Sequence, residues 1–355
     1  MAARSAAAFA PGRVNVIGEH TDYNEGLALP FAIEQGVTVR AVRTPGEGAG
    51  AERIEALALD LDERDGFLVR EPRPAEGWRA FVRGAVGELR ARGLELPGAL
   101  LEISGDVPRG GGLSSSAALT VALCLALIEL AAPGEEADLR DDPVALARLC
   151  SRVENEWTGA HTGLLDQLAS LCGARDAALL IDFRSLAIER VPLALGGWRF
   201  ATADSGQRHS HASSGYNQRR EECARACELL GIRSLRDADA DQVAQLPEPL
   251  RSRARHVLEE NERVVAAAAA LRERDLPELA RLINASHASL RDLYEVSTPA
   301  VETTVRGLLD AGAAGARPIG GGFGGAVLGL FAPGTQLPPG AIAVAPGPGA
   351  HLLGS

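Results

Sequence analysis

Apolar and polar positions follow two different patterns along the chain. Up to about residue 204, short apolar runs of strand length alternate with segments whose apolar positions recur at helical spacing. The strands expected there are 14–17, 37–42, 54–59, 99–103, 178–181, 188–193 and 200–203. The helices expected there are 78–89, 117–132, 142–156 and 164–171.

Beyond residue 216 the pattern becomes mostly helical. The helices expected are 216–230, 250–274, 279–294 and 299–309. The C-terminal part then reads as a strand, a glycine-rich loop and a second strand, at 316–319, 320–325 and 326–331. The chain is therefore predicted to be an α+β protein with two domains, 1–186 and 187–355.

A loop rich in glycine and serine precedes the most apolar predicted helix. Residues 108–118 read Pro-Arg-Gly-Gly-Gly-Leu-Ser-Ser-Ser-Ala-Ala. Glycine lets a backbone approach a ligand closely, and the start of a helix offers free N–H groups and the positive end of its dipole. The stretch therefore predicts an anion site, most commonly one for phosphate. The alternative is a flexible turn before a core helix.

The charge composition limits how a phosphate could be handled. The chain has 355 residues and a net charge of −11, which argues against a nucleic-acid-binding surface. All 36 basic residues are arginine, since the sequence contains no lysine. The lysine-dependent sites of P-loop nucleotide hydrolases and protein kinases are thereby excluded, and so is lysine Schiff-base chemistry. Phosphate must be held by backbone, arginine, hydroxyl groups and a metal ion.

Cysteine usage and hydropathy favour a cytoplasmic protein without membrane contact. The five cysteines are an odd number and show no Cys-x-x-Cys spacing. The N-terminus lacks a signal pattern, and the apolar run 117–132 is interrupted by Glu129.

Two polar segments are candidates for chemistry. Residues 12–23 combine Arg13 with Glu19, His20 and Asp22, groups that suit the hydroxyls of a sugar, although a solvated loop is the alternative. Asp166 begins a predicted helix after a turn, where a carboxylate is also favoured by the helix dipole alone. It could flank one cleft with Glu154, one residue acting as base and the other as metal ligand.

The glycine run 320–325 formally matches a dinucleotide-binding pattern. That pattern requires a helix after the glycines, whereas a strand is expected here. We therefore interpret the run as a tight turn that can approach a ligand or another backbone closely.

Four segments in this order resemble the GHMP small-molecule kinase superfamily and, within it, the galactokinases. Residues 11–23 are similar to the signature PGRVNLIGEHTDY, and 108–118 are similar to the phosphate motif PxGxGLSSSA. Residues 208–223 resemble the segment RHS…SSxYxxRRxEC, and 316–325 resemble the motif that ends GGGFGG. The resemblance implies a two-domain fold with a mixed N-terminal sheet and an antiparallel C-terminal sheet. Helices would accompany both sheets, and the active site would lie in the cleft between the domains.

The resemblance also implies a role for each matching residue. Asp166 would be the catalytic carboxylate, with Arg13 beside it to offset charge on the transferred phosphoryl group. The sugar would be held by Glu19, His20, Asp22, Gly163, Asp166 and Tyr216. ATP would be held by Trp78, Gly110, Gly111, Gly112, Leu113, Ser114, Ser115 and Ser116. Mg²⁺ would be held by Ser116 and Glu154.

The activity implied is phosphorylation of D-galactose by ATP at the anomeric hydroxyl, the entry step of galactose catabolism. The protein is expected to act as a monomer, with a weak dimer as the alternative. Some positions depart from the family pattern: Phe81 and Arg83 replace a tyrosine and a lysine after Trp78. The alternatives are a kinase of a related sugar, such as N-acetylgalactosamine or arabinose, and a sugar- and ATP-binding sensor that regulates transcription. Against the sensor, the serine–alanine part of the phosphate motif, 114–118, is intact.

Overall fold

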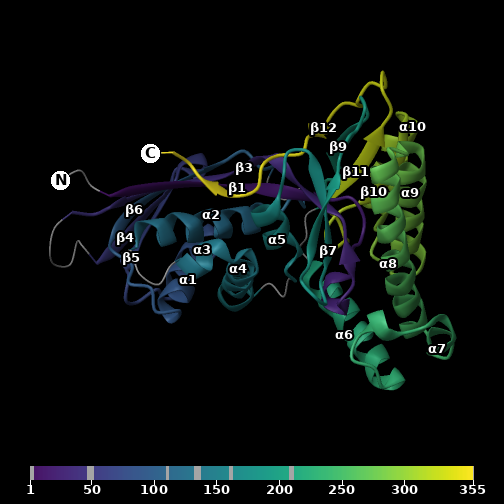
Figure 1. Ribbon diagram of the computed structural model, residues 1–355, viewed down its shortest axis with the longest axis horizontal. Helices are drawn as coiled ribbons and strands as arrows, with labels where there is room; N and C mark the ends of the chain where they lie inside the picture. Colours follow the sequence, from purple (N-terminus) through teal and green to yellow (C-terminus); the bar gives the residue numbers. More distant parts are fainter. Residues whose placement is uncertain are drawn as a thin grey trace.

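The structure, a computed structural model, describes residues 4–45, 52–108, 112–131, 137–159, 163–207 and 212–354. The predicted ATP-binding residues Gly110 and Gly111 lie outside these ranges, as do residues 208–211 of the segment 208–223. Figure 1 shows an elongated molecule in which two long strands extend through one half and a group of helices forms the far end.

The first half contains a six-stranded mixed sheet, as predicted. The sheet order is β13-β1-β3-β6-β4-β5, in which β4 and β6 are parallel and the other neighbours are antiparallel. The strands are β1 (Ser5–Asn15), β3 (Pro30–Arg43), β4 (Arg53–Ala58), β5 (Glu63–Leu68), β6 (Ala99–Gly105) and β13 (His351–Leu352).

Helices cover one face of this sheet (Figure 1). They are α1 (Trp78–Ala91), α2 (Ser115–Leu130), α3 (Ala137–Asp141), α4 (Pro143–Thr158) and α5 (Leu165–Cys172). α2 packs directly on β1 and β3, and α1 and α4 pack on α2. α2 is apolar around its whole circumference because it lies between the sheet and the other helices. Its start, where the phosphate motif lies, is thus fixed by the core.

The second half contains a four-stranded antiparallel sheet, also as predicted, in the order β10-β11-β9-β12. Its strands are β9 (Arg199–Asp204), β10 (Ala313–Pro318), β11 (Ala326–Phe331) and β12 (Ile342–Val344). The helices of this half are α6 (Ala212–Leu230), α7 (Ala240–Ala244), α8 (Leu250–Glu273), α9 (Leu276–Asp292) and α10 (Pro299–Asp310). α9 and α10 pack on β10, and α8 packs on α9. The short helices η1 (Asp22–Asn24), η2 (Leu59–Leu61) and η3 (Leu235–Asp237) lie in connecting segments.

A small sheet joins the two halves. It consists of β2 (Leu27–Ala28), β7 (Ala177–Asp182) and β8 (Ile188–Pro192), in the order β2-β7-β8. β7 and β8 pair across the expected boundary between residues 186 and 187, which remains a prediction.

The C-terminal segment also connects the halves. β12 pairs with β9 in the second sheet, and β13 pairs with β1 in the first sheet. Between these strands, the Gly347 N–H donates to the Ala32 carbonyl at 2.7 Å, and the Ala350 N–H donates to the Ser170 carbonyl at 2.8 Å. The segment thus forms backbone hydrogen bonds in both halves.

The first predicted strand was misplaced. β1 ends at Asn15 and begins at Ser5, whereas the apolar pattern predicted only 14–17. Ala6, Ala8 and Ala10 point into the core at every second position. Alanine has little preference for strands, so the sequence of this segment does not predict one. β3 likewise begins at Pro30 rather than 37, and β5 was not predicted. In the part of the chain that the structure describes, we find no helix long and apolar enough to cross a membrane.

Candidate active site

Asp166 is held between the predicted sugar segment, 12–23, and the predicted phosphate motif, 108–118, which we call the phosphate loop. It lies in the first turn of α5, where Arg13 on β1 contacts its Oδ1 through Nε at 2.7 Å and through Nη2 at 2.6 Å. Ser114 donates a hydrogen bond to the other oxygen, Oδ2. The third arginine nitrogen, Nη1, donates to the Gly112 carbonyl at 2.5 Å. The Asp166 side chain is nonetheless 22% exposed, so one carboxylate is fixed in orientation and still open to a substrate.

The end of the phosphate loop is docked on β1 by backbone contacts. The Arg13 N–H donates to the Leu113 carbonyl at 3.1 Å. That approach requires Gly12, because a Cβ there would lie 2.5 Å from the Leu113 oxygen.

Ser114 turns the loop into α2. Its φ of 59° is in the left-handed region, which is uncommon for a residue other than glycine. The side chain does not cap α2, because its hydroxyl is directed to Asp166 instead. The Ser114 side chain therefore does not occupy the N–H groups of the first turn, and the anion site expected there stays a prediction.

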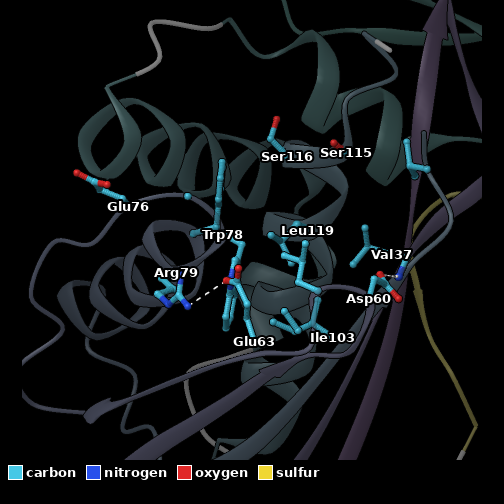
Figure 2. A pocket seen from close by; sticks show the side chains of 16 residues that line it. Val37, Asp60, Glu63, Glu76, Trp78, Arg79, Ile103, Ser115, Ser116 and Leu119 are labelled. Atoms are coloured by element: carbon cyan, nitrogen blue, oxygen red, sulfur yellow. Dashed lines mark hydrogen bonds and ion pairs between the residues drawn. The ribbon is translucent and has the colours of Figure 1, made fainter. Parts of the chain in front are cut away.

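A pocket of about 610 Å³ connects the start of α2 with α1. Figure 2 shows Ser115 and Ser116 at one end, Trp78 beside them, and apolar side chains that include Ile103 and Leu119 on the walls. Trp78 and the two serines were predicted to bind different parts of ATP, and here they line one pocket. Its aromatic wall and its anion-binding end suit a nucleoside and its phosphates, respectively.

Trp78 is held in place by Glu63, a residue that the sequence did not single out. The indole Nε1–H donates to Glu63 Oε2 at 2.7 Å (Figure 2). The same oxygen forms an ion pair with Arg79 at 3.0 Å, and the Arg79 guanidinium lies 5.0 Å from the centre of the Trp78 ring system. The three side chains form one unit at the rim of the pocket.

The two residues predicted to bind Mg²⁺ lie on packed helices. Ser116 is in the first turn of α2 and lines the pocket, and Glu154 is buried on α4, which packs against α2. A hydroxyl and a carboxylate are hard oxygen donors, and Mg²⁺ is commonly held by one or two such groups together with substrate phosphates. The donor set therefore fits the ion.

The predicted sugar residues surround the Asp22 carboxylate. Burial raises the pKa of Asp22 to about 6, and the negative charges of Asp166 and Glu19 act in the same direction. Gly163 lies against it, since a Cβ at that position would be 1.8 Å from Asp22 Oδ2. Three carboxylates thus converge beside a glycine that leaves room.

His20 and Tyr216 form an aromatic wall next to these carboxylates. Their ring centres are 5.3 Å apart. His20 is buried, and burial together with the nearby positive groups lowers its pKa to about 3, so the ring is neutral. The structure therefore brings the predicted sugar residues together in one place, and their role in binding a sugar stays a prediction.

Glu19 is fixed from the second half of the chain. Its Oε1 accepts a hydrogen bond from the Gly320 N–H at 2.9 Å and pairs with Arg317 Nη2 at 3.0 Å. Arg317 is fully buried, and its Nη1 donates to the Val16 carbonyl at 2.8 Å. It lies within the segment 316–325 that carries the resemblance, but no local sequence pattern indicates its partner.

Two further buried residues anchor the same loop from α8. Glu260 accepts hydrogen bonds from the Gly18 N–H and from Ser286, and Arg263 together with His256 and Arg317 lowers its pKa to about 2 despite burial. His256 contacts the Glu19 carbonyl through Nε2 at 3.2 Å. Neither residue had been expected to contribute, because the helical pattern of α8 resembles that of an ordinary amphipathic helix.

The glycine run 320–325 is a tight turn, as predicted, and β11 follows it directly. Gly322 lies against Val296, where a Cβ would approach the Val296 Cβ to 2.5 Å. Gly324 similarly packs on the Gln207 carbonyl. The turn thus brings the backbone at Gly320 to Glu19.

The chain matches three models of protein families. The galactokinase galactose-binding signature matches residues 2–43, the GHMP kinase N-terminal domain matches 80–174, and the GHMP kinase C-terminal domain matches 267–338. Galactokinase from Roseiflexus sp. is 44% identical over 338 residues, which cover 90% of this chain and 82% of that protein. Galactokinase from Mycobacterium tuberculosis is 42% identical over 331 residues, covering 90% and 87%, respectively.

Solved structures agree with these relationships. Lactococcus lactis galactokinase complexed with galactose superposes with a TM-score of 0.87 at 29% identity, covering 99% of this chain and 95% of the other. Methanococcus jannaschii mevalonate kinase superposes with a TM-score of 0.65 at 18% identity, covering 92% and 90%. The latter likeness is one of fold.

Proposed function

Because this chain belongs to the galactokinases of the GHMP kinase family, we propose that it transfers the γ-phosphoryl group of ATP to the anomeric hydroxyl of D-galactose. The product is α-D-galactose 1-phosphate. The observation that carries the proposal is the position of Asp166, whose two oxygens are held by Arg13 from the galactose-signature segment and by Ser114 from the phosphate loop. One carboxylate thus lies where an acceptor and a phosphoryl donor would meet.

In this mechanism Asp166 orients the anomeric hydroxyl and accepts its proton as the hydroxyl oxygen attacks the γ-phosphorus. The bond between the γ-phosphorus and the bridging β–γ oxygen breaks, and ADP leaves with the electron pair of that bond. The contacts from Arg13 and Ser114 fix the carboxylate, so that little reorganisation is needed at the moment of transfer. Arg13 also places positive charge beside the transferred group.

The sugar is held by the groups around Asp22. Glu19, Asp22 and Asp166 accept hydrogen bonds from sugar hydroxyls, and His20 and Tyr216 border the ring. Gly163 leaves the space in which the Asp22 carboxylate lies.

ATP occupies the pocket between α1 and α2, with its base near Trp78 and its phosphates at Ser115 and Ser116. Ser116 and Glu154 would hold Mg²⁺, which when bound neutralises charge on the phosphate oxygens. The free N–H groups at the start of α2 stabilise the same charge.

The proposal extends to the setting of the enzyme. We expect a monomer in the cytoplasm, and the five cysteines, none of which is in a disulfide, are typical of a reducing compartment. Light scattering of the purified protein after gel filtration tests the oligomeric state.

A sugar panel tests the function directly. The purified protein is incubated with ATP, Mg²⁺ and galactose, N-acetylgalactosamine, arabinose or glucose, and the phosphorylated product is identified by ³¹P NMR. Turnover on galactose with phosphate at the anomeric carbon is expected, and the Asp166→Asn protein prepared in parallel controls for contaminating kinases. Turnover on another sugar but not on galactose overturns the substrate, and binding of both ligands without turnover favours the sensor.

A further inference from the structure

A row of buried and partly buried side chains extends from the Nδ1 side of the His20 ring. His20 Nδ1 lies 2.9 Å from the Tyr23 hydroxyl, which lies 2.8 Å from the Tyr294 hydroxyl. The Tyr294 hydroxyl in turn lies 3.1 Å from Cys223 Sγ. The four residues come from the galactose-signature segment, the end of α9 and α6, so only the fold brings them together.

The other ring nitrogen of His20 has no hydrogen bond of ordinary geometry among the residues that the structure describes. His20 is 4% exposed, and the Gly321 backbone lies close enough to the ring to act on its pKa in the upward direction, but Nε2 itself makes no hydrogen bond within the described chain. The ring is packed between Tyr216 and Tyr294, whose centres lie 5.3 and 4.7 Å from its own. A buried polar atom without a partner is costly, so Nε2 is suited to a ligand in the sugar site.

The neutral ring carries one proton, and its position decides what Nε2 can offer. With the proton on Nε2 the ring donates to a sugar oxygen, whereas with the proton on Nδ1 it accepts from a sugar hydroxyl. Burial keeps the ring uncharged, because it lowers the His20 pKa to about 3. The choice therefore lies between two tautomers.

The order of donors along the row favours one of them. A phenol hydroxyl is a good donor and an imidazole nitrogen is a good acceptor, so Tyr23 donates to Nδ1. The Tyr23 oxygen then accepts from Tyr294, and the Tyr294 oxygen accepts from the Cys223 thiol. The reverse order would end on sulfur, which is a weak acceptor.

We infer that Tyr23 and Tyr294 are positioning residues that fix His20 in the tautomer with its proton on Nε2, so that His20 donates a hydrogen bond to the bound sugar. The inference rests on the proposed function for the identity of the ligand, but the tautomer is a property of the free protein. Cys223 is the first donor of the row, and its thiol also contacts the Asn24 side chain. Because each hydroxyl has a defined direction, removal of either one weakens the preference of the ring.

The tautomer is read directly from the wild-type protein. Histidine labelled with ¹⁵N gives separate Nδ1 and Nε2 signals in long-range ¹H–¹⁵N spectra, and the His20→Gln protein assigns those of His20. We expect a protonated Nε2 and an unprotonated Nδ1, with the Nε2 signal moving when galactose is added. A protonated Nδ1 in the wild-type protein overturns the inference without bearing on turnover.

Two phenylalanine variants test the row while keeping the rings. Tyr23→Phe should mix the two tautomers and raise the KM for galactose about 5- to 10-fold, with the KM for ATP unchanged. Tyr294→Phe should also mix the tautomers and raise the KM for galactose, but to a smaller extent. In the Tyr23→Phe background it should change neither quantity further. Unchanged His20 signals in folded Tyr23→Phe protein contradict the inference.

Two substitutions of Cys223, at the far end of the row, form a matched pair of variants. Cys223→Ser keeps a donor at the same position and should leave the His20 signals as in the wild type, whereas Cys223→Ala removes it and should shift them toward the Tyr294→Phe spectrum. Identical spectra for the serine and alanine variants would remove Cys223 from the row. A protein that shows the expected tautomer but no turnover on galactose would refute the proposed function and leave the row standing.

Discussion

Ser114 reaches Asp166 from a left-handed backbone conformation, with φ at 59° and its hydroxyl donating to Oδ2. A conformation of this kind costs a residue other than glycine about 1–2 kcal/mol. The hydrogen bond of the hydroxyl offsets this cost, and it ties the predicted phosphate loop to the carboxylate that we propose faces the acceptor. Strain and hydrogen bonding at this position are separable by substitution.

Ser114→Gly and Ser114→Ala should differ in stability but not in activity. Both remove the hydroxyl, so both should lower kcat about tenfold, the value expected for one hydrogen bond to a charged group. Only glycine relieves the strain, so Ser114→Gly should be about 1 kcal/mol more stable than Ser114→Ala in urea unfolding. A wild-type kcat in either variant would show that the Ser114 hydroxyl does not contribute to catalysis.

Asp166→Asn should reduce kcat by about 10²- to 10⁴-fold, because an amide cannot accept the hydroxyl proton. Asparagine keeps an oxygen for Arg13, so the KM values should change little. Steady-state kinetics with both substrates measure the effect. A rate within about tenfold of wild type would rule out Asp166 as the general base.

Glu63 variants should affect nucleotide binding alone. Glu63→Ala frees the Trp78 indole and should raise the KM for ATP about 3- to 10-fold, with the KM for galactose unchanged. Glu63→Gln still accepts from the indole N–H but loses the charge of the pair with Arg79, which is partly exposed and contributes little. The glutamine variant should therefore behave as the wild type, and equal effects of both substitutions would show that charge, not orientation, matters.

Asp22 should make the free enzyme less stable as the pH rises from about 4 to 6. Its pKa is raised from 3.8 in the unfolded chain to about 6 in the folded protein, so folding favours the protonated form. The associated stability is complete below pH 4 and is lost as the pH passes 6. A shift of about two units corresponds to about 3 kcal/mol, and the partial exposure of the side chain reduces this to about 1–2 kcal/mol.

The buried histidines change the folding stability in the opposite direction over the same pH range. The pKa values of His20 and His256 are lowered to about 3 and about 4, so their contribution is complete above pH 6.5 and is lost as the pH falls. Comparison with Asp22→Asn isolates the carboxyl group. Urea unfolding at several pH values should show the variant gaining stability relative to wild type between pH 4 and 6, and parallel pH profiles would refute the shift.

Local sequence patterns predicted the elements that carry the site better than they predicted its supports. The glycine–serine loop predicted where α2 begins. The strand pattern after Gly325 correctly indicated that no dinucleotide-binding helix follows the glycines. Arg317 could not have been assigned in this way, because its partner Glu19 is almost 300 residues away and the pairing exists only after both halves fold. The same holds for Tyr294 and Cys223. The sequence predicts that Ser114 binds phosphate. In the structure its left-handed backbone conformation directs its hydroxyl to Asp166, and no local pattern predicts that conformation.

The C-terminal segment that pairs in both sheets has a mechanical consequence. β12 and β13 are joined by only a few residues, and the intervening backbone is hydrogen-bonded to Ala32 and Ser170. Ala32, Ser170 and β13 all belong to the first half, so this short segment anchors β12 of the second sheet to the first half. A wide hinge opening would have to break either these bonds or the pairing of β12 with β9, and thermal unfolding of the two halves should therefore occur as one cooperative event.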